Sequence, residues 1–206
     1  MWVKICGVTT LDDALHAQAC GADAVGLNLH PGSPRCVSPA RAAALAAALD
    51  CATALVAVDL PEAELAAIVA EVRPTFVQLH GDQPPGFGAS LGVPLLRAWR
   101  ARQGVLDAIR ADAAPRFLLD AYVPGAFGGT GRRVDLDLAR RAAALGQLVL
   151  AGGLTPDNVA AVVAAARPFG VDVASGVEAA PGRKDPDKVR AFIQRARGSA
   201  GPSRPS

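Results

Sequence analysis

Residues 2–30 read WVKICGVTTLDDALHAQACGADAVGLNLH and contain one complete strand–helix–strand unit. The apolar run Val3–Cys6 is followed by TTLDD, in which a threonine cap and two early acids predict the start of a helix. A helical pattern covers Leu11–Cys20, and a second apolar run covers Ala24–Leu29. Because strands joined by a helix form the repeating unit of α/β proteins, this stretch indicates the fold class.

The same alternation continues along the chain. Strands are predicted near Val3–Cys6, Ala24–Leu29, Ala54–Val58, Phe76–Leu79, Leu95–Ala98, Phe117–Leu119, Leu148–Ala151 and Val171–Ala174. Helices are predicted at Leu11–Cys20, Pro39–Leu49, Pro61–Val72, Val105–Asp112, Leu136–Leu145, Pro156–Ala166 and Pro186–Arg197, with a weaker helical pattern at Pro84–Leu91. Eight predicted strands alternating with helices indicate a single α/β domain, a (β/α)8 TIM barrel over residues 1–197. A doubly wound open sheet is the alternative. The tail 198–206 is predicted to be disordered.

Composition argues against several classes of protein. The chain has 206 residues, a net charge of +2, one Tyr and two Trp, so the basic stripe and stacking aromatics of a nucleic-acid binder are missing. The longest apolar stretch, AAALAAALDCATALVAV, is broken by Asp50 and is typical of a helix followed by a strand rather than a membrane span. The first residues show no charged leader before an apolar segment, so we expect a cytoplasmic protein.

The cysteines suggest neither a metal site nor a disulfide framework. They are Cys6, Cys20, Cys36 and Cys51; none forms a CxxC pair, and no histidine stands at metal-ligand spacing from them. We therefore expect free thiols, no metal and no cofactor. Only its placement in the fold can give one of these thiols a special role.

Polar residues interrupt the strands at matching positions. Successive side chains of a strand point to opposite faces, and both faces of a parallel barrel strand are buried. The polar residues that this alternation places inside the barrel are Lys4, Cys6, Asn28, His30, Gln78, His80, Asp120 and Asp172. Those at or just past the C-terminal end of their strand are Cys6, His30, His80 and Asp120. Since barrel active sites are built at that face, these residues predict a catalytic site.

Lys4 and Asp172 lie deeper in the predicted barrel. The first and last strands are neighbours once a barrel closes, so we predict an ion pair between these two side chains inside it. The alternative is that Lys4 extends its ammonium group out of the barrel floor into solvent.

Two glycine-containing loops are suited to an anion. AGGLTPDN follows the seventh strand and ASGVEAAPGRKD the eighth, where barrels often bind phosphate. The backbone N–H groups of Gly152, Gly153, Ser175 and Gly176 can converge on a phosphate there, with favourable helix N-termini behind them. Tight turns are the alternative explanation for each glycine pair.

A third glycine-rich loop, PGAFGGTGRR, follows the sixth strand. It lacks the Lys-Ser/Thr of a P-loop, so nucleotide binding is disfavoured. We predict instead a mobile flap over the site, with Gly128, Gly129 and Gly131 giving it freedom to move.

Six segments in order from Lys4 to Asp185 resemble one enzyme family. They are KICGVTT, GADAVGLNLHPGSPRCVSP, VQLHGD, LLDA followed by GGTG, LAGGLTPDNV, and GVDVASGVEAAPGRKD, and together they resemble the phosphoribosylanthranilate isomerase family of tryptophan biosynthesis. The resemblance implies an isomerase without metal or cofactor that converts N-(5-phosphoribosyl)anthranilate to 1-(2-carboxyphenylamino)-1-deoxyribulose 5-phosphate by an Amadori rearrangement. It implies a small-molecule substrate, and a monomer or a homodimer.

The resemblance also implies roles for individual residues. Asp120 corresponds to the general acid that protonates the furanose ring oxygen, and Cys6 to the general base that removes the proton from C2 of the sugar. Arg35 corresponds to the arginine that holds the anthranilate carboxylate, and His80 to a positioning group near the site. An acid that still carries its proton near neutral pH needs a raised pKa.

Some positions depart from the family pattern. Asn28 and His30 stand where aromatic or apolar residues are common, residues 134–136 replace an FDW segment, Ala174 replaces the first of two serines, and Asp59 replaces an asparagine. These departures affect the expected walls around the anthranilate ring rather than the acid or the base.

Two alternative functions fit these residues less well. The related histidine-pathway barrel and dual-substrate phosphosugar isomerases use two aspartates, one of them where this chain has Cys6. A non-catalytic barrel that binds phosphosugars is expected to lack Cys6 or Asp120, and both are present.

Overall fold

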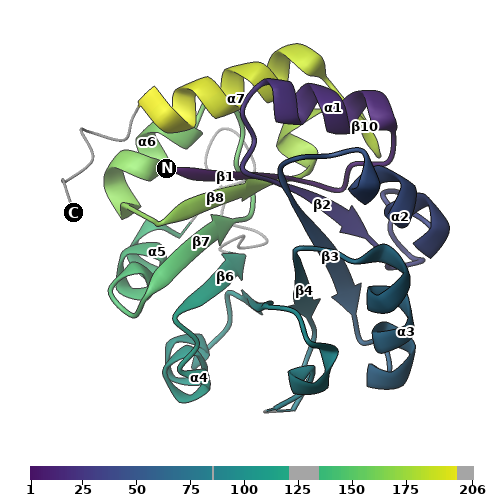
Figure 1. The fold of residues 1–206 in the computed structure, drawn as a ribbon. Coiled ribbons are helices and arrows are strands. Elements are labelled where there is room, and N and C mark those ends of the chain that lie inside the picture. Colours follow the sequence, from purple (N-terminus) through teal and green to yellow (C-terminus); the bar gives the residue numbers. More distant parts are fainter. Residues whose placement is uncertain (85, 121–134, 199–206) are drawn as a thin grey trace.

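A computed structural model of the chain describes residues 1–84, 86–120 and 135–198, and shows a closed barrel of eight parallel strands (Figure 1). The strands follow one another around the barrel in chain order: β1 (Trp2–Cys6), β2 (Ala24–Asn28), β3 (Ala52–Val58), β4 (Phe76–His80), β5 (Leu95–Arg100), β6 (Arg116–Asp120), β7 (Gln147–Ala151) and β8 (Gly170–Val173). The barrel prediction is confirmed, and the open-sheet alternative is wrong.

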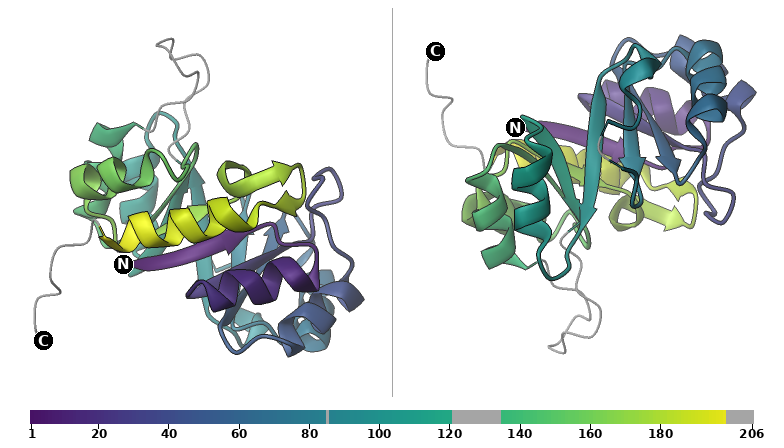
Figure 2. Two further views of the ribbon diagram at one scale, coloured as in Figure 1. Left: turned by 90° about the horizontal axis from the view of Figure 1, so that it is seen from above. Right: turned by 90° about the horizontal axis from the view of Figure 1, so that it is seen from below.

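The helices surround the barrel (Figures 1 and 2). They are α1 (Leu11–Ala19), α2 (Pro39–Ala47), α3 (Glu62–Val72), α4 (Val105–Asp112), α5 (Leu136–Ala143), α6 (Val159–Ala166) and α7 (Pro186–Gly198). The last helix, α7, lies beside α1 and packs against β1, so the two ends of the barrel sequence meet (Figure 2). None of the helices in the described part of the chain is long and apolar enough to cross a membrane.

Two predicted helices need correction. The helical pattern at Pro84–Leu91 gives only a short 3-10 turn, η1 (Ala89–Leu91), because Gly86 and Gly88 both adopt φ of +83°, which a helix cannot accommodate. Helix α6 starts at Val159 rather than Pro156. The cause is Asn158, whose side chain accepts a hydrogen bond from the Thr155 backbone N–H (2.8 Å) and holds the preceding residues in a turn.

The segment after β8 was predicted to be a loop but contains regular structure. A 3-10 turn, η2 (Ser175–Val177), leads into a two-stranded antiparallel hairpin, β9 (Glu178–Ala180) and β10 (Arg183–Lys184). The strands are three and two residues long, too short to show a recognisable alternation in the sequence. This hairpin lies beside the loop after β2, because Glu178 is bound to Arg35 of that loop.

The predicted ion pair inside the barrel is confirmed. Lys4 and Asp172 are register partners on β1 and β8, and Lys4 Nζ lies 3.1 Å from each carboxylate oxygen of Asp172. The lysine is 0% exposed and the aspartate 6%, so the alternative in which Lys4 reaches solvent is wrong. On the other face of β1, Val3 and Ile5 are fully buried against the helical layer.

A packed apolar floor closes the barrel below the site. Its interior cluster contains Leu96, Ala98, Leu118, Val149 and Ala151. Trp2 and Phe76, the first residues of β1 and β4, and Phe169, just before β8, pack against this cluster. The ring centroids of Phe76 and Phe169 lie 6.3 and 6.4 Å from that of Trp2. The open end of the barrel is therefore the C-terminal one.

Candidate active site

A cavity of about 600 Å³ opens at the C-terminal end of the barrel. The last residue of each of the eight barrel strands lines it, and these residues are Cys6, Asn28, Val58, His80, Arg100, Asp120, Ala151 and Val173. His30, just past β2, lines it too. The strand alternation thus placed four polar residues, Cys6, His30, His80 and Asp120, around one cavity.

Cys6 lies beside the buried lysine. Cys6 and Gly26 are register partners on β1 and β2, and a Cβ atom on Gly26 would lie 2.7 Å from Cys6 Sγ and 2.9 Å from Lys4 Nζ. Only a glycine leaves room there for both side chains. Burial raises the pKa of the Cys6 thiol, and the Lys4 ammonium group, which hydrogen-bonds the sulfur, opposes that rise. The thiol form of Cys6 is therefore favoured at neutral pH.

Asp120 lies across the cavity from Cys6. In the closed barrel, β7 and β8 separate their strands on the shorter path. The neighbour of Asp120 is Arg100, its register partner at the end of β5. Arg100 was missed because β5 was predicted to end at Ala98; extending the two-residue alternation by one step would have found it.

His80 forms a contact with Gln78 two residues earlier on the same strand face. Their Nε2 atoms lie 2.5 Å apart, and Gln78 is 1% exposed. Burial, reinforced by the positive charges of Lys4 and Arg100, lowers the pKa of His80 to about 4. His80 therefore offers the cavity a neutral imidazole at physiological pH.

The low pKa of His80 makes the free energy of unfolding depend on pH. The unfolded chain binds a proton at His80 near pH 6.5, whereas the folded protein binds it near pH 4, so falling pH favours unfolding within this window. As the pH falls from about 6 to about 4.5, we expect protonation of His80 in the unfolded chain to lower the free energy of unfolding by roughly 1 kcal/mol per pH unit. Urea denaturation of His80→Gln should show a flatter pH dependence in that window. Equal slopes for wild type and variant would contradict the prediction.

The two predicted phosphate loops meet at the cavity. Gly152 and Gly153 follow β7 with φ of +94° and +66°, and Ser175 and Gly176 form the start of η2 after β8. All four line the cavity. A Cβ atom on Gly176 would overlap the Leu154 carbonyl oxygen, so the loops are in direct backbone contact. The three predicted flap residues, Gly128, Gly129 and Gly131, lie outside the described residues.

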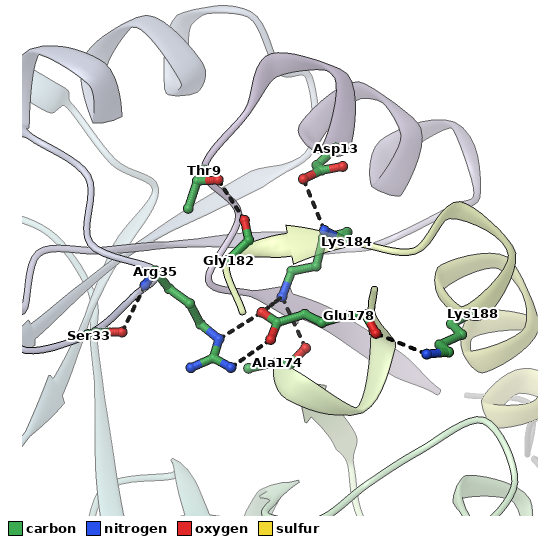
Figure 3. Close-up of polar contacts among 9 residues, drawn as sticks. All are labelled: Thr9, Asp13, Ser33, Arg35, Ala174, Glu178, Gly182, Lys184 and Lys188. Atoms are coloured by element: carbon green, nitrogen blue, oxygen red, sulfur yellow. Dashed lines mark hydrogen bonds and ion pairs between the residues drawn. The ribbon is translucent and has the colours of Figure 1, made fainter. Parts of the chain in front are cut away.

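Arg35 lies in the loop between β2 and α2 and lines the same cavity. The aliphatic part of its side chain packs over Gly7, because a Cβ atom at that position would overlap Arg35 Cδ. Its guanidinium group forms a bidentate pair with Glu178 at the start of β9, with Nε and Nη2 at 2.7 and 2.6 Å from the two carboxylate oxygens (Figure 3). The buried Lys184 of β10 also contacts Glu178, at 3.0 Å.

Nothing in the sequence indicated a role for Glu178 or Lys184. Both lie in the segment after β8 that was predicted to be a loop, and Glu178 is separated from Arg35 by 143 residues. No local sequence pattern indicates such a pairing. The departures Asn28 and His30 do lie at the cavity, where the Asn28 side chain accepts a hydrogen bond from the His30 backbone N–H (2.8 Å).

The active sites of (β/α)8-barrel enzymes lie at the C-terminal ends of the strands, and the cavity of this barrel opens at that end among polar side chains. The fold and the cavity are those of a (β/α)8-barrel enzyme. The family model described as N-(5'phosphoribosyl)anthranilate (PRA) isomerase matches residues 3–195, and the chain belongs to this family.

Individual relatives agree with the family match. The chain is 47% identical over 199 residues to the N-(5'-phosphoribosyl)anthranilate isomerase of Geobacter sulfurreducens, covering 95% of this chain and 98% of the relative. Its fold matches the crystal structure of the isomerase from Thermotoga maritima with a TM-score of 0.87 and 36% identity, covering 96% and 99% of the two chains. A further structure, with a TM-score of 0.85, 34% identity and the same coverage, is an isomerase in complex with reduced 1-(o-carboxyphenylamino)-1-deoxyribulose 5-phosphate.

Proposed function

We propose that this protein catalyses the Amadori rearrangement of N-(5'-phosphoribosyl)anthranilate to 1-(o-carboxyphenylamino)-1-deoxyribulose 5-phosphate in tryptophan biosynthesis. The observation that carries the proposal is the placement of Cys6 and Asp120 on opposite sides of one cavity, in a chain of this family. An aldose-to-ketose shift needs one acid and one base on the two sides of a bound sugar, and it consumes no cofactor. We place the reaction in the cytoplasm, catalysed by a monomer or a homodimer.

In the first step, Asp120 acts as the general acid. Its carboxyl group gives a proton to the furanose ring oxygen while the bond from that oxygen to C1 breaks. The lone pair of the anthranilate nitrogen forms a double bond to C1, which opens the ring to an iminium ion. The residue is then a carboxylate.

In the second step, Cys6 acts as the general base. Its thiolate takes the proton from C2, and the electrons of the broken C–H bond form a C1–C2 double bond while the C1–N double bond collapses onto nitrogen. The enolamine then becomes the ketone as C1 gains a proton and the hydroxyl group on C2 loses its proton. The positive iminium next to the sulfur favours the thiolate, as Lys4 does from the other side.

The remaining residues bind the two anionic ends of the substrate. Arg35 pairs with the anthranilate carboxylate, which matches the fork of a guanidinium group. The backbone N–H groups of the two glycine loops bind the phosphate through Gly152, Gly153, Ser175 and Gly176. His80, as a neutral imidazole, positions the sugar.

The phosphate assignment gives a prediction at Gly176. An added Cβ atom must displace the Leu154 carbonyl, because the two backbones are already in contact. We expect Gly176→Ala to raise KM about tenfold, corresponding to about 1.4 kcal/mol of lost binding, with kcat changed much less. Steady-state kinetics measures both constants. The matched control is Gly198→Ala, where a Cβ atom meets no other atom within 4 Å, and an equal KM for the two variants would contradict the assignment.

Two experiments test the proposed function. The wild-type chain should restore growth without tryptophan to an auxotroph that lacks this isomerase, and failure to do so despite soluble expression would contradict the function. A crystal soaked in inorganic phosphate should show the anion between Gly153 and residues 175–176. An anion bound only elsewhere would contradict the phosphate subsite.

A further inference from the structure

We propose that Glu178 is a positioning residue for carboxylate recognition, which holds Arg35 by one edge of its guanidinium group while Lys184 compensates the charge of the glutamate. Arg35 then presents its other edge to the anthranilate carboxylate in a fixed orientation and with its positive charge still effective. This inference rests on the proposed function, in which Arg35 binds the carboxylate of the substrate.

The contacts leave one edge of Arg35 available. Glu178 accepts hydrogen bonds from Nε and Nη2, which form the side edge of the guanidinium plane. The group has five N–H donors, so Nη1 and the second hydrogen of Nη2 remain. Within the described residues, Nη1 of Arg35 has no hydrogen-bond partner. These two nitrogens form the end edge, which can take a second carboxylate in bidentate fashion.

The positive charge of Lys184 allows Glu178 to position Arg35 without neutralising the cluster. A carboxylate paired with Arg35 alone would cancel the positive charge that a substrate anion needs. Lys184 Nζ lies 3.0 Å from Glu178, and its side chain is 1% exposed (Figure 3). Two cations and one anion leave the cluster with a charge of +1. A bound carboxylate makes it neutral, which a largely buried site favours.

The hairpin that carries Glu178 is anchored on several sides. The Gly182 carbonyl accepts a hydrogen bond from Thr9 Oγ1 (2.7 Å), and the Lys184 backbone N–H donates to Asp13 (3.2 Å). Lys188 Nζ donates to the Glu178 carbonyl (2.9 Å), as Figure 3 shows. Glu178 is thus fixed to the first loop and helix of the barrel and to α7. A carboxylate held in this way orients the long Arg35 side chain before substrate arrives, which lowers the entropic cost of binding.

Positioning and simple electrostatics predict opposite results for one substitution. Glu178→Gln removes a negative charge near Arg35, so electrostatics alone predicts tighter binding of the substrate carboxylate. The same substitution also removes the charged bidentate pair that holds the Arg35 side chain. If Glu178 acts by positioning, binding of the substrate carboxylate therefore becomes weaker. The sign of the change therefore separates the two explanations.

The experiment measures the carboxylate ratio, defined as Kd for reduced 1-phenylamino-1-deoxyribulose 5-phosphate divided by Kd for its o-carboxyphenyl counterpart. Calorimetry with wild type should give a ratio of about 10–100, the effect of a charged hydrogen-bonded pair. We expect Glu178→Gln to lower the ratio about tenfold, and Lys184→Met to lower it through loss of charge. The carboxyl-free probe should bind both variants within about twofold of wild type. Glu64→Gln on the outer helix α3 is the matched control.

The outcomes distinguish this inference from the proposed function. If Glu178→Gln keeps or raises the ratio while Arg35→Ala brings it to about one, the positioning role is overturned and the substrate assignment stands. If Arg35→Ala keeps the wild-type ratio, or wild type binds neither probe, the substrate assignment fails and the inference fails with it. Should Glu178→Gln not fold, Glu178→Asp keeps the charge but withdraws the carboxylate, and it must also lower the ratio.

Discussion

Cys6→Ala and Asp120→Asn are each expected to lower kcat/KM by about 10²- to 10⁴-fold, the usual contribution of a positioned acid or base. Each substitution removes one proton transfer and leaves the cavity almost unchanged in shape. Binding of the reduced product analogue should therefore stay within a few-fold of wild type. Steady-state kinetics and calorimetry measure the two effects separately.

The pH profile distinguishes a base from a residue that only shapes the site. Because the pKa of Cys6 is raised, the thiolate fraction of wild type grows with pH across the neutral range, and kcat/KM should grow with it. The residual activity of Cys6→Ala should lose that rise. Cys6→Ser should not restore it, because a hydroxyl group is a far weaker acid than a thiol.

Two controls accompany these variants. Cys51→Ala changes a half-buried thiol that does not line the cavity, and Asp107→Asn changes an exposed acid of α4. Both should keep wild-type kinetics. Wild-type turnover in Cys6→Ala or in Asp120→Asn would overturn the mechanism, even if the wild-type chain rescues the auxotroph.

The sequence predicted most of the fold because one physical rule applied throughout. A parallel barrel buries both faces of each strand, so a polar residue within a strand stands out and its face can be read from the two-residue period. That rule placed Lys4 opposite Asp172 without any knowledge of the loops, since the first and last strands must meet. It also gathered Cys6, His80 and Asp120 at one end of the barrel.

The parts that sequence reasoning missed depend on contacts with no local pattern. Arg35 was identified through a family resemblance, but nothing near it in the chain points to Glu178 or Lys184. These residues meet only because the hairpin after β8 folds back onto the loop after β2. Likewise, the Pro84–Leu91 pattern looked helical by its apolar spacing, yet the backbone angles of Gly86 and Gly88 prevent a helix.

Breaking the Lys4–Asp172 pair is expected to have the largest effect on stability. Lys4→Met removes the cation and leaves a carboxylate that is 6% exposed without its main compensating charge, which in buried pairs costs about 3–5 kcal/mol of unfolding free energy. Gly26 of β2 packs closely against Lys4 Nζ on one side of the pair, and the apolar cluster of the barrel interior offers no polar group to replace the lysine. Asp172 does line the cavity, so water on that side sets how large the loss becomes. Urea denaturation followed by circular dichroism measures the loss.

An exposed pair provides the comparison for this prediction. Arg110 and Asp107 on α4 lie 2.6 Å apart with side chains 56% and 82% exposed, so Arg110→Met should cost less than about 1 kcal/mol. The double variant Lys4→Met/Asp172→Leu removes both buried charges and should recover most of the loss, because the cost of a buried pair lies mainly in leaving one partner alone. If Lys4→Met is too unstable to purify, Asp172→Asn tests the same pair with a smaller change in volume. A loss below about 1 kcal/mol in either single variant would mean that water or another group compensates the remaining charge.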